Sequence, residues 1–478
     1  MPLRMIKAKF RSKVPLVRGK IGELAIIVLT FLLAMLLLQV LLPDRYHKSR
    51  RRRIYNVICI ELAGVLTDFI VYRRLVALFQ LDNQWPLGRL LLRRGFGGGS
   101  RPFRWPGDLF KTAVLLFLLM AHLSFLFFHH TPPGWSPATA TPHWFVLACF
   151  LCLGFYLHLA FILLLVLLLE HVVGPFVNHR LPNHPAVDLL LRKRKLHTTL
   201  SLLAAALFSF VCVLVAQAPP RVVTVTVALS DLPAELSGFR IALLTDIHIG
   251  PTVGRDRVRT MVDLVNLQNP DLVALSGDVV DGEESHWHRA TDPLRRLKAP
   301  HGVYYSTGNH EYYHGHIDEW IKILRRNGIQ TLRNANVKIR KHRWSLSYFC
   351  FGGVDDLDAG RSGLRGHSMN VTKALEGCDQ QLPSVVMIHQ PNGAKLALDD
   401  PARGSSRLDL VLAGHTHGGQ FYVFYPLVYL INTYFAGYYR HSSGTQIYVS
   451  PGVNYWGPPM KVFRMSEISI IVLRRAPS

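Results

Sequence analysis

The sequence predicts a protein of two parts, an α-helical membrane-spanning first half and a globular α/β second half. Residues 1–221 contain several long apolar runs with very few charged side chains. Residues 222–478 instead alternate short apolar runs, typical of buried strands, with amphipathic runs typical of helices, which indicates stacked α/β layers. The length of 478 residues also exceeds that of one ordinary domain.

Five segments of the first half are expected to cross the membrane as helices. Four are long and apolar enough to span the hydrocarbon core of a bilayer: residues 24–42, 112–128, 144–169 and 200–216. A fifth, residues 54–71, contains Glu61 and Asp68. Acidic side chains at membrane depth are costly unless they line the interior of a helix bundle. We favour five spans over four.

The charges of the connecting loops predict the orientation of these spans. Cytosolic loops are enriched in Lys and Arg; loop 72–111 carries eight of them, loop 129–143 none and loop 170–199 five. The uncharged loop should therefore face the lumen or exterior, and the last span should place the globular domain on the non-cytosolic side. A glycosylation sequon at Asn370 is compatible with that side. The basic residues 50–53 lie in a loop that five spans would make external, so either segment 54–71 does not cross or the charge rule fails there.

The basic balance of the chain fits a membrane protein better than a nucleic-acid-binding protein. The net charge is +23, and most of it lies in the first 200 residues, where basic runs flank the apolar segments. A basic chain can bind nucleic acid, but charges placed in this way act as topology signals. No nucleic-acid partner is therefore expected.

The cysteines divide between the two halves. Cys350 and Cys378 are the only pair in the globular half, and a disulfide between them stays open because sequence does not give their separation in space. The other four lie in or near apolar runs, where cysteine behaves as a small hydrophobic residue: Cys59, Cys149, Cys152 and Cys212.

The globular half begins with a strand at residues 222–229, where β-branched and polar residues alternate. Helices are expected at residues 255–268, whose apolar residues recur at helical spacing on one face, and at residues 317–326. The later part is richer in strands, which favours a mixed sheet there. The further strands are expected at residues 239–245, 271–276, 303–307, 348–354, 384–388, 408–413, 446–449 and 468–473.

Five short polar motifs lie at the C-terminal ends of strand-like runs. They are Asp246-x-His248, Gly277-Asp278, Gly308-Asn309-His310-Glu311, His389 and Gly414-His415-x-His417. Side chains at the ends of several strands can converge on one crevice. Seven of these residues are candidate metal ligands: Asp246, His248, Asp278, Asn309, His389, His415 and His417.

The residue types and their spacing suit a pair of divalent cations. Residues two apart in an extended segment point the same way, so Asp246 and His248 can bind one ion, as can His415 and His417. Asp278 has two carboxylate oxygens and can bridge two ions. Carboxylate, amide and imidazole ligands without thiolate favour manganese, iron or zinc, so two cations (Mn, Fe or Zn) are the expected cofactors.

Two such cations imply hydrolysis of a phosphate ester. A metal pair about 4 Å apart can convert a water molecule to hydroxide and offset the charge that grows on the phosphoryl oxygens. The hydroxide would attack phosphorus in line, without a covalent enzyme intermediate. His310, beside the ligand Asn309, could protonate the leaving oxygen or bind the phosphoryl group. His310 and Asp278 are therefore the catalytic candidates.

Taken together, the five motifs resemble the signature of the calcineurin-like metallophosphoesterases, over roughly residues 238–455. The resemblance implies a four-layer αββα fold with the metals at the strand ends, and His310 as the catalytic imidazole. The globular half is also similar to bacterial membrane-associated phosphoesterases of this superfamily. The resemblance implies two ligand sets: Asp246, His248, Asp278 and His417 for one metal, and Asp278, Asn309, His389 and His415 for the other.

One departure from the superfamily's protein phosphatases bears on the substrate. Those enzymes carry Asp-Arg-Gly shortly after the Gly-Asp motif, and the Arg binds the substrate phosphate. Here Gly282 stands where that Arg would be. A phosphodiester or phosphomonoester of a lipid or nucleotide is therefore favoured over a phosphoprotein.

Three functions stay open at this point. The first is a membrane-anchored phosphoesterase acting on a phosphate ester, lipid-linked or not, in contact with membrane lipids. The second is a membrane scaffold or receptor whose phosphoesterase domain binds metal without turnover. The third is a tethered phosphodiesterase for soluble nucleotides. No protein partner can be inferred from the sequence.

Aromatic residues near the motifs have open roles. The run at residues 422–439 could form an apolar wall of the site, rest on the membrane surface or fill the core. Residues 454–457 are expected to form a turn beneath the site. Four residues after His310 could line the pocket: Tyr312, Tyr313, His314 and His316.

Overall fold

The computed structural model describes residues 49–78, 105–129, 142–181, 184–185, 187, 193–314, 316–400, 406–462 and 465–477. The chain forms two compact units, Met1–Arg73 and Arg74–Ser478. The second unit contains three long apolar helices and the whole α/β domain.

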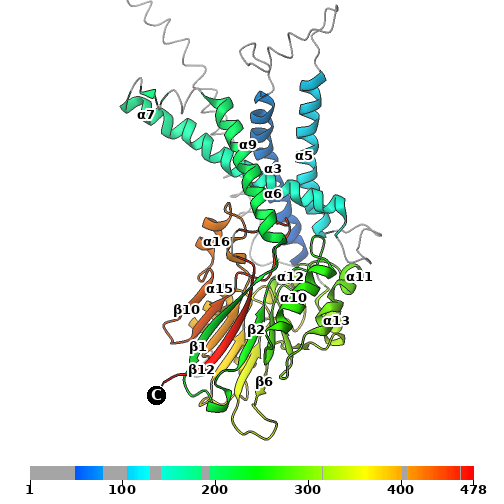
Figure 1. Ribbon diagram of the computed structural model, residues 1–478, viewed down its shortest axis with the longest axis vertical. Helices are drawn as coiled ribbons and strands as arrows, with labels where there is room; N and C mark the ends of the chain where they lie inside the picture. Colours follow the sequence, from blue (N-terminus) through cyan, green and yellow to red (C-terminus); the bar gives the residue numbers. More distant parts are fainter. Residues whose placement is uncertain are drawn as a thin grey trace, which may run out of the picture. The chain divides into compact units, whose positions relative to one another are not determined.

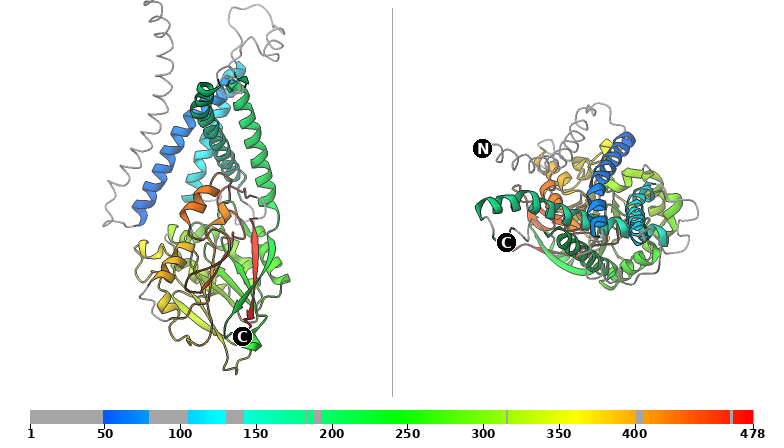
Figure 2. Two further views of the ribbon diagram at one scale, coloured as in Figure 1. Left: turned by 90° about the vertical axis from the view of Figure 1, so that its left-hand side faces the viewer. Right: turned by 90° about the horizontal axis from the view of Figure 1, so that it is seen from above.

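Most described residues of the apolar first half are helical. Helix α3 is Ser49–Leu78, α5 is Trp105–His129, and α9 is Arg194–Gln217. Helix α6 (Trp144–Leu168) continues through the π-helical turn η1 (Leu169–Val173) into α7 (Gly174–Arg180). Helix α6 packs against both α5 and α9, which Figure 2 shows in cyan to green.

Three helical stretches in the described chain are long and apolar enough to cross a membrane, fewer than the five predicted spans. They are Asp108–Phe127, Trp144–Arg180 and Arg194–Gln217, and they correspond to the predicted segments 112–128, 144–169 and 200–216. Segment 54–71 lies within α3 and is helical, but its crossing stays a prediction. Segment 24–42 lies outside the described residues.

Two mixed sheets of six strands form the core of the globular half (Figure 1). The first has the order β1-β12-β2-β3-β4-β5, with β12 antiparallel to β2 and the other pairs parallel. Its strands are β1 Arg221–Leu229, β2 Arg240–Leu244, β3 Leu272–Ser276, β4 Val303–Ser306, β5 Gln330–Thr331 and β12 Glu467–Arg475.

The second sheet has the order β10-β11-β9-β8-β7-β6, with antiparallel pairs at its two edges. The mixed sheet expected in the later half is thus confirmed, and the first sheet is mixed as well because β12 returns into it. The strands of the second sheet are β6 Ala335–Ile339, β7 Phe349–Gly353, β8 Ser384–Met387, β9 Leu410–Ala413, β10 Gly437–Arg440 and β11 Gln446–Val449.

The side-chain alternation of the strands builds four layers. On one face of the first sheet Ile241 and Leu243 pack against Phe351 and other residues of the second sheet. The alternate residues Ala242 and Leu244 point the other way and pack with the helices, as the two-residue period of a strand requires. A separate cluster joins the outer face of the second sheet to its own helices.

The helices of the α/β domain therefore cover the outer faces of both sheets. Helices α10 and α13 lie on one side of the sheets and α15 toward the other (Figure 1). The helices are α10 Arg255–Leu267, α11 Glu284–Trp287, α12 Asn309–His314, α13 Ile317–Arg326, α14 Val371–Ala374, α15 Pro391–Asp399 and α16 Tyr425–Ile431, with shorter turns η2 Ala234–Leu236, η3 His288–Arg296, η4 Ala359–Arg361 and η6 His417–Gly419.

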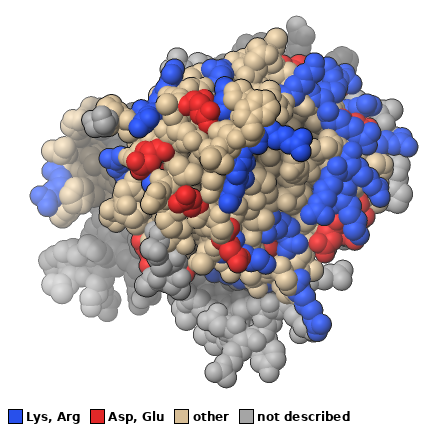
Figure 3. All heavy atoms as spheres, turned by 90° about the horizontal axis from the view of Figure 1, so that it is seen from below, with Lys and Arg blue, Asp and Glu red and all other residues tan. Residues whose placement is uncertain are grey.

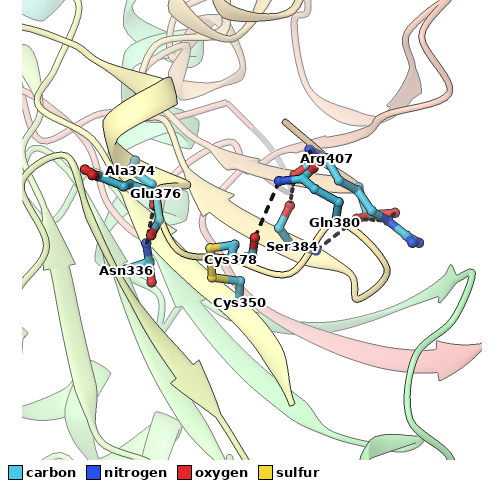
Figure 4. Close-up of a disulfide and its surroundings, with 9 residues drawn as sticks. Asn336, Cys350, Ala374, Glu376, Cys378, Gln380, Ser384 and Arg407 are labelled. Carbon is cyan, nitrogen blue, oxygen red and sulfur yellow. Dashed lines mark hydrogen bonds and ion pairs between the residues drawn. A yellow bond between two sulfur atoms is a disulfide. The ribbon is translucent and has the colours of Figure 1, made fainter. Parts of the chain in front are cut away.

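A disulfide joins Cys350 to Cys378, which settles the pairing that the sequence left open (Figure 4). Cys350 lies on β7, Cys378 follows α14, and their Cα atoms are 5.9 Å apart, within the usual range for a disulfide. Asn336 of β6 holds the same segment by donating hydrogen bonds to the carbonyls of Ala374 (2.8 Å) and Glu376 (2.9 Å). Stable disulfides are typical of proteins outside the cytosol.

Replacing both cysteines by serine should destabilise the α/β domain. The bond closes a chain segment with a sequence separation of 28 residues, and the loop-closure entropy of such a segment is worth roughly 3 to 4 kcal/mol. Thermal unfolding of the full chain should show a lower midpoint for the double variant. A midpoint equal to that of the wild type would show that the bond does not constrain the unfolded chain.

Candidate metal centre

The carboxyl ends of both sheets meet at one crevice. Strands β2, β3 and β4 of the first sheet and β8 and β9 of the second are each followed directly by one of the five polar motifs. The structure brings all seven predicted ligands together there, and six of them are buried while His415 is partly exposed. The convergence expected from strand ends is therefore observed.

One group of donor atoms consists of Asp246, His248 and His417. His248 Nε2 lies 2.9 Å from His417 Nε2, and His417 Nε2 lies 3.3 Å from Asp246 Oδ1. All three ligand atoms lie within 4.8 Å of one another. One carboxylate and two imidazoles at this spacing can surround a single cation.

A second group consists of Asp278, His389 and His415, with Asn309 beside it. His389 Nε2 lies 3.0 Å from Asp278 Oδ2, and His415 Nδ1 lies 2.8 Å from Asn309 Oδ1. The same Oδ2 of Asp278 is 3.8 Å from Nε2 of His248 in the first group. Asp278 therefore lies between the two groups, where a ligand shared by two cations has to lie.

The backbone of the ligands is held in an unfavourable conformation. Nine non-glycine residues of the described chain have a positive φ, and five of them are predicted ligands. Such left-handed residues cost roughly 1–3 kcal/mol each and cluster at functional sites. The five are Asp246 (φ 59), His248 (φ 54), Asp278 (φ 53), His415 (φ 72) and His417 (φ 51).

Two glycines of the motifs are needed because the loops approach each other closely. A Cβ atom on Gly308 would lie 2.1 Å from Oδ1 of Asp278, and one on Gly414 would lie 2.5 Å from Oδ2 of Asp246. Any other residue at these positions would collide with a ligand carboxylate. The glycines therefore set the spacing between neighbouring motif loops.

The comparisons with known proteins agree with this geometry. Residues 239–419 match the calcineurin-like phosphoesterase family. A protein of Danio rerio named "Transmembrane protein with metallophosphoesterase domain" is 33% identical over 458 residues, which are 96% of this chain and 98% of that protein. This chain belongs to the same family. A Bos taurus protein of the same name is 36% identical over 373 residues, covering 77% of this chain and 82% of its own.

Two further similarities were also found. A putative metallophosphoesterase of Caenorhabditis elegans is 36% identical over 367 residues, which are 77% of this chain and 74% of that protein. Among solved structures, a dimetal phosphatase from Danio rerio has a TM-score of 0.33 and 14% identity, and covers 48% of this chain and 91% of its own.

Asp281 orients two imidazoles of the metallophosphoesterase centre, a role that the sequence did not reveal. Its Oδ2 accepts a hydrogen bond from His248 Nδ1 (2.9 Å), and its Oδ1 accepts one from His310 Nδ1 (2.5 Å). The Nε2 atom of His248 thus faces His417, and that of His310 faces Asp278. A carboxylate behind a ligating histidine is a common support of metal sites.

Glu311 fixes the two loops that carry Asp278 and Asn309. Its buried carboxylate accepts hydrogen bonds from four backbone N–H groups, and four donors to one carboxylate leave neither loop free to shift relative to the other. These donors are Gly308 (2.7 Å), Asp278 (3.1 Å), Val279 (2.6 Å) and Val280 (3.2 Å). The motif Gly-Asn-His-Glu contained this residue, but only the fold shows its partners.

The pKa values of His310, Asp281 and His415 are consistent with a metal centre. Burial lowers the pKa of His310, but the carboxylates of Asp281 and Asp278 outweigh burial and raise the pKa to about 9. Burial raises the pKa of Asp281, while His310 and His248 outweigh burial and leave that pKa below its usual range. Burial lowers the pKa of His415 to about 4, so this imidazole stays neutral, the form in which an imidazole can bind a metal ion.

The donor set fits a resident cation on chemical grounds. His389 Nδ1 is 2.7 Å from the carbonyl oxygen of Ser276, so that nitrogen carries the hydrogen and Nε2 presents a lone pair to Asp278. Two electron-pair donors facing each other at 3.0 Å repel unless a positive charge lies between them. In the absence of a cation that charge is a proton: burial lowers the pKa of His389, but Asp278 raises it well above its usual value.

The four residues that were expected to line the pocket differ in where they lie. Tyr313 lies at the site, with its ring centroid 4.9 Å from that of His310. Tyr312 is buried and contacts Thr307 and His367 instead. His316 pairs with Glu284 (3.1 Å) away from the centre. The side chain of His314 lies outside the described residues.

The turn at residues 454–457 supports the centre and forms part of its rim. Asn454 Nδ2 donates to the carbonyl of Ile247 (2.9 Å), between two ligands. Trp456 lies beside His310, with ring centroids 5.3 Å apart. Beneath the turn, the buried ammonium of Lys461 donates to three carbonyls, at Pro451, Gly452 and Asn454, and burial lowers the pKa of Lys461 to about 7.

The aromatic run at residues 422–439 does not behave as one unit. Tyr434 and Phe435 are buried, and Tyr434 belongs to the core of the second sheet. Tyr422 and Tyr429 are exposed. The core-filling interpretation thus holds for Tyr434 and Phe435, whereas Tyr422, Tyr429 and Tyr438 lie at the surface.

Replacing Asp281 by Asn should weaken metal binding by roughly 10- to 100-fold, the usual effect of removing a carboxylate behind a ligating histidine. An amide can accept from one of the two imidazoles but presents its NH₂ group to the other, so one ring loses its orientation. Metal content after dialysis against defined Mn²⁺ concentrations measures the effect. Asp263→Asn, at an exposed pair with Arg296, is the matched control, and equal affinities in both variants would refute the role of Asp281.

Proposed function

We propose that this chain is a multi-pass membrane phosphoesterase that hydrolyses a phosphate ester with the help of two divalent cations, manganese, iron or zinc. The observation that carries the proposal is the position of Asp278 between two groups of buried donor atoms at the ends of five strands. Residues 1–221 would form the membrane anchor and residues 222–478 the hydrolytic domain.

The residues of the crevice would divide the work as follows. Two bound cations would activate a water molecule and offset negative charge on the phosphoryl oxygens. Asp281 and Glu311 keep the ligands and His310 in place. His310 Nε2 faces Asp278 Oδ2 at 4.0 Å and would donate a proton to the leaving oxygen. The ligand sets would be Asp246, His248, Asp278 and His417 for one cation, and Asp278, Asn309, His389 and His415 for the other.

The substrate would be a phosphodiester or phosphomonoester of a lipid or nucleotide. Gly282 replaces the arginine with which protein phosphatases of the superfamily bind phosphate. Gly282 has a φ of 105°, and its carbonyl accepts a hydrogen bond from Trp320 Nε1 at 3.0 Å. This position therefore belongs to a core-facing turn of the domain.

The domain would lie on the non-cytosolic side of the membrane. Loop charges predict that side, and the Cys350–Cys378 disulfide supports it because disulfides persist in oxidising compartments. A domain whose two cysteines were found reduced in its native membrane would contradict this placement.

Asp278→Asn should abolish most hydrolysis. The variant keeps the shape of the shared ligand but removes its charge, which should cost several kcal/mol of transition-state stabilisation, a fall in rate of roughly 100-fold or more. The full chain, loaded with Mn²⁺, is assayed on a chromogenic phosphodiester and a chromogenic monoester, with Asp263→Asn as the control. Equal rates for wild type and Asp278→Asn on both esters would leave a non-catalytic scaffold or receptor as the function.

His310→Gln should distinguish a proton donor from a phosphate-binding group. A lost proton donor slows esters with poor leaving groups most, by roughly 100-fold or more, whereas esters with good leaving groups need little protonation. Rates of wild type and variant are compared over a series of aryl and alkyl phosphate esters. A uniform loss across the series would assign His310 to phosphoryl binding instead.

A further inference from the structure

The rim of the metal centre continues directly into contacts with the apolar helices. The loop that carries Trp456 beside His310 goes on to Met460 and Val462, which pack in one cluster with Cys212 of α9. The backbone N–H of Lys461 donates to the carbonyl of Cys212 at 3.0 Å. Both sides of this loop belong to the compact unit Arg74–Ser478, so the centre lies next to the end of a candidate membrane span.

A second segment makes the same connection. Gln420 follows the ligand loop of His415 and His417, and its side chain exchanges hydrogen bonds with the backbone of Trp456 (2.7 and 2.9 Å). The next residue, Phe421, is buried with its ring against His158 of α6, at a centroid distance of 5.7 Å. The ring of Tyr422 lies 6.0 Å from that of Phe208 of α9.

Beyond this contact the chain exposes an apolar surface, which we call the aromatic segment (residues 422–431). Helix α16 has no buried residue, and Leu430 is 79% exposed. No charged residue occurs between Gln420 and Arg440. By contrast, the face of the molecule in Figure 3 carries Lys, Arg, Asp and Glu side chains over much of its area. A contiguous exposed apolar patch marks an interaction surface.

The surface of α9 identifies what covers this patch. Helix α9 exposes apolar side chains along its length, and a helix of this composition is covered by lipid. Since Tyr422 contacts Phe208 among these side chains, the apolar surface of α9 continues onto the aromatic segment. Tyrosine is also enriched where proteins meet the membrane–water boundary. The exposed side chains of α9 include Leu203, Leu207, Phe208, Phe210, Val211 and Leu214.

We propose that the aromatic segment inserts into the leaflet beside α9, and that the metal centre acts on the phosphate ester of a lipid in that leaflet. Interfacial helices lie at the boundary between headgroups and acyl chains, which brings the neighbouring rim of Trp456 and Tyr313 to the level of lipid phosphates. A lipid then presents its phosphate without leaving the membrane. The substrate class rests on the proposed phosphoesterase function, whereas the insertion does not.

Insertion is tested directly by fluorescence quenching, with the full chain reconstituted in lipid vesicles. A fluorescent non-natural amino acid is placed at position 430, or at position 267 as a control, since Leu267 of α10 is 72% exposed but lies in the domain helices. Vesicles of brominated phosphatidylcholine should quench the probe at 430 strongly and the probe at 267 weakly. Equal quenching at both positions would overturn the insertion.

The substrate class is tested by comparing esters that differ only in their acyl chains. Phosphatidic acid in phosphatidylcholine vesicles is compared with glycerol 3-phosphate, and phosphatidylglycerol with its deacylated form. At least one acylated ester should have a kcat/KM ten or more times that of its partner. Leu430→Asp should lower the ratio of lipid to chromogenic activity at least tenfold, and Leu267→Asp should leave it unchanged.

The outcomes separate this inference from the proposed function. Hydrolysis of the chromogenic esters without any preference for acylated forms would refute the proposed lipid substrate but not the proposed phosphoesterase activity. Failure of wild type to exceed Asp278→Asn on every ester would overturn the phosphoesterase, and the quenching result would still decide the insertion.

Discussion

The carboxylate of Asp278 is the point on which the arrangement of this protein depends. One of its oxygens faces imidazoles of both donor groups, and the other accepts the backbone N–H of His310 at 2.9 Å. Its own backbone N–H is held by Glu311. Such a buried anion is tolerable only when positive charge surrounds it. The loops, their glycines and their left-handed residues all follow from bringing histidines of both sheets to this one side chain.

The convergence of the seven candidate ligands could be predicted because each motif follows an apolar strand, and parallel strands end at the same edge of a sheet. Asp281 and Glu311 could not be assigned in the same way. Asp281 accepts hydrogen bonds from His248 and His310, which lie 33 and 29 positions away in the chain. Glu311 accepts from backbone N–H groups, which every residue type but proline has, so no sequence pattern identifies these partners. The fit of Gly308 against Asp278 likewise depends on a distance that only the folded chain provides.

The apolar half shows a similar division. Length and hydropathy identified the stretches that became α5, α6 and α9. A long apolar run in a membrane can pair its backbone N–H and C=O groups within a helix and has few other ways to do so. Hydropathy could not tell that Phe421 and Tyr422 would pack on α6 and α9 while Tyr434 would enter the core of the second sheet. Neighbouring aromatic residues look alike in sequence. The chain turns at α16, and only this turn places residues before and after it in different environments.

The place of β12 in the first sheet affects how the protein is made. Strand β12 lies between β1 and β2, yet every other strand of both sheets precedes it in the chain. Until it arrives, β1 has no neighbour and the edge of β2 is open. The nascent chain therefore has α9 complete long before the domain can close, and a premature stop codon before Glu467 would remove an interior strand of the first sheet.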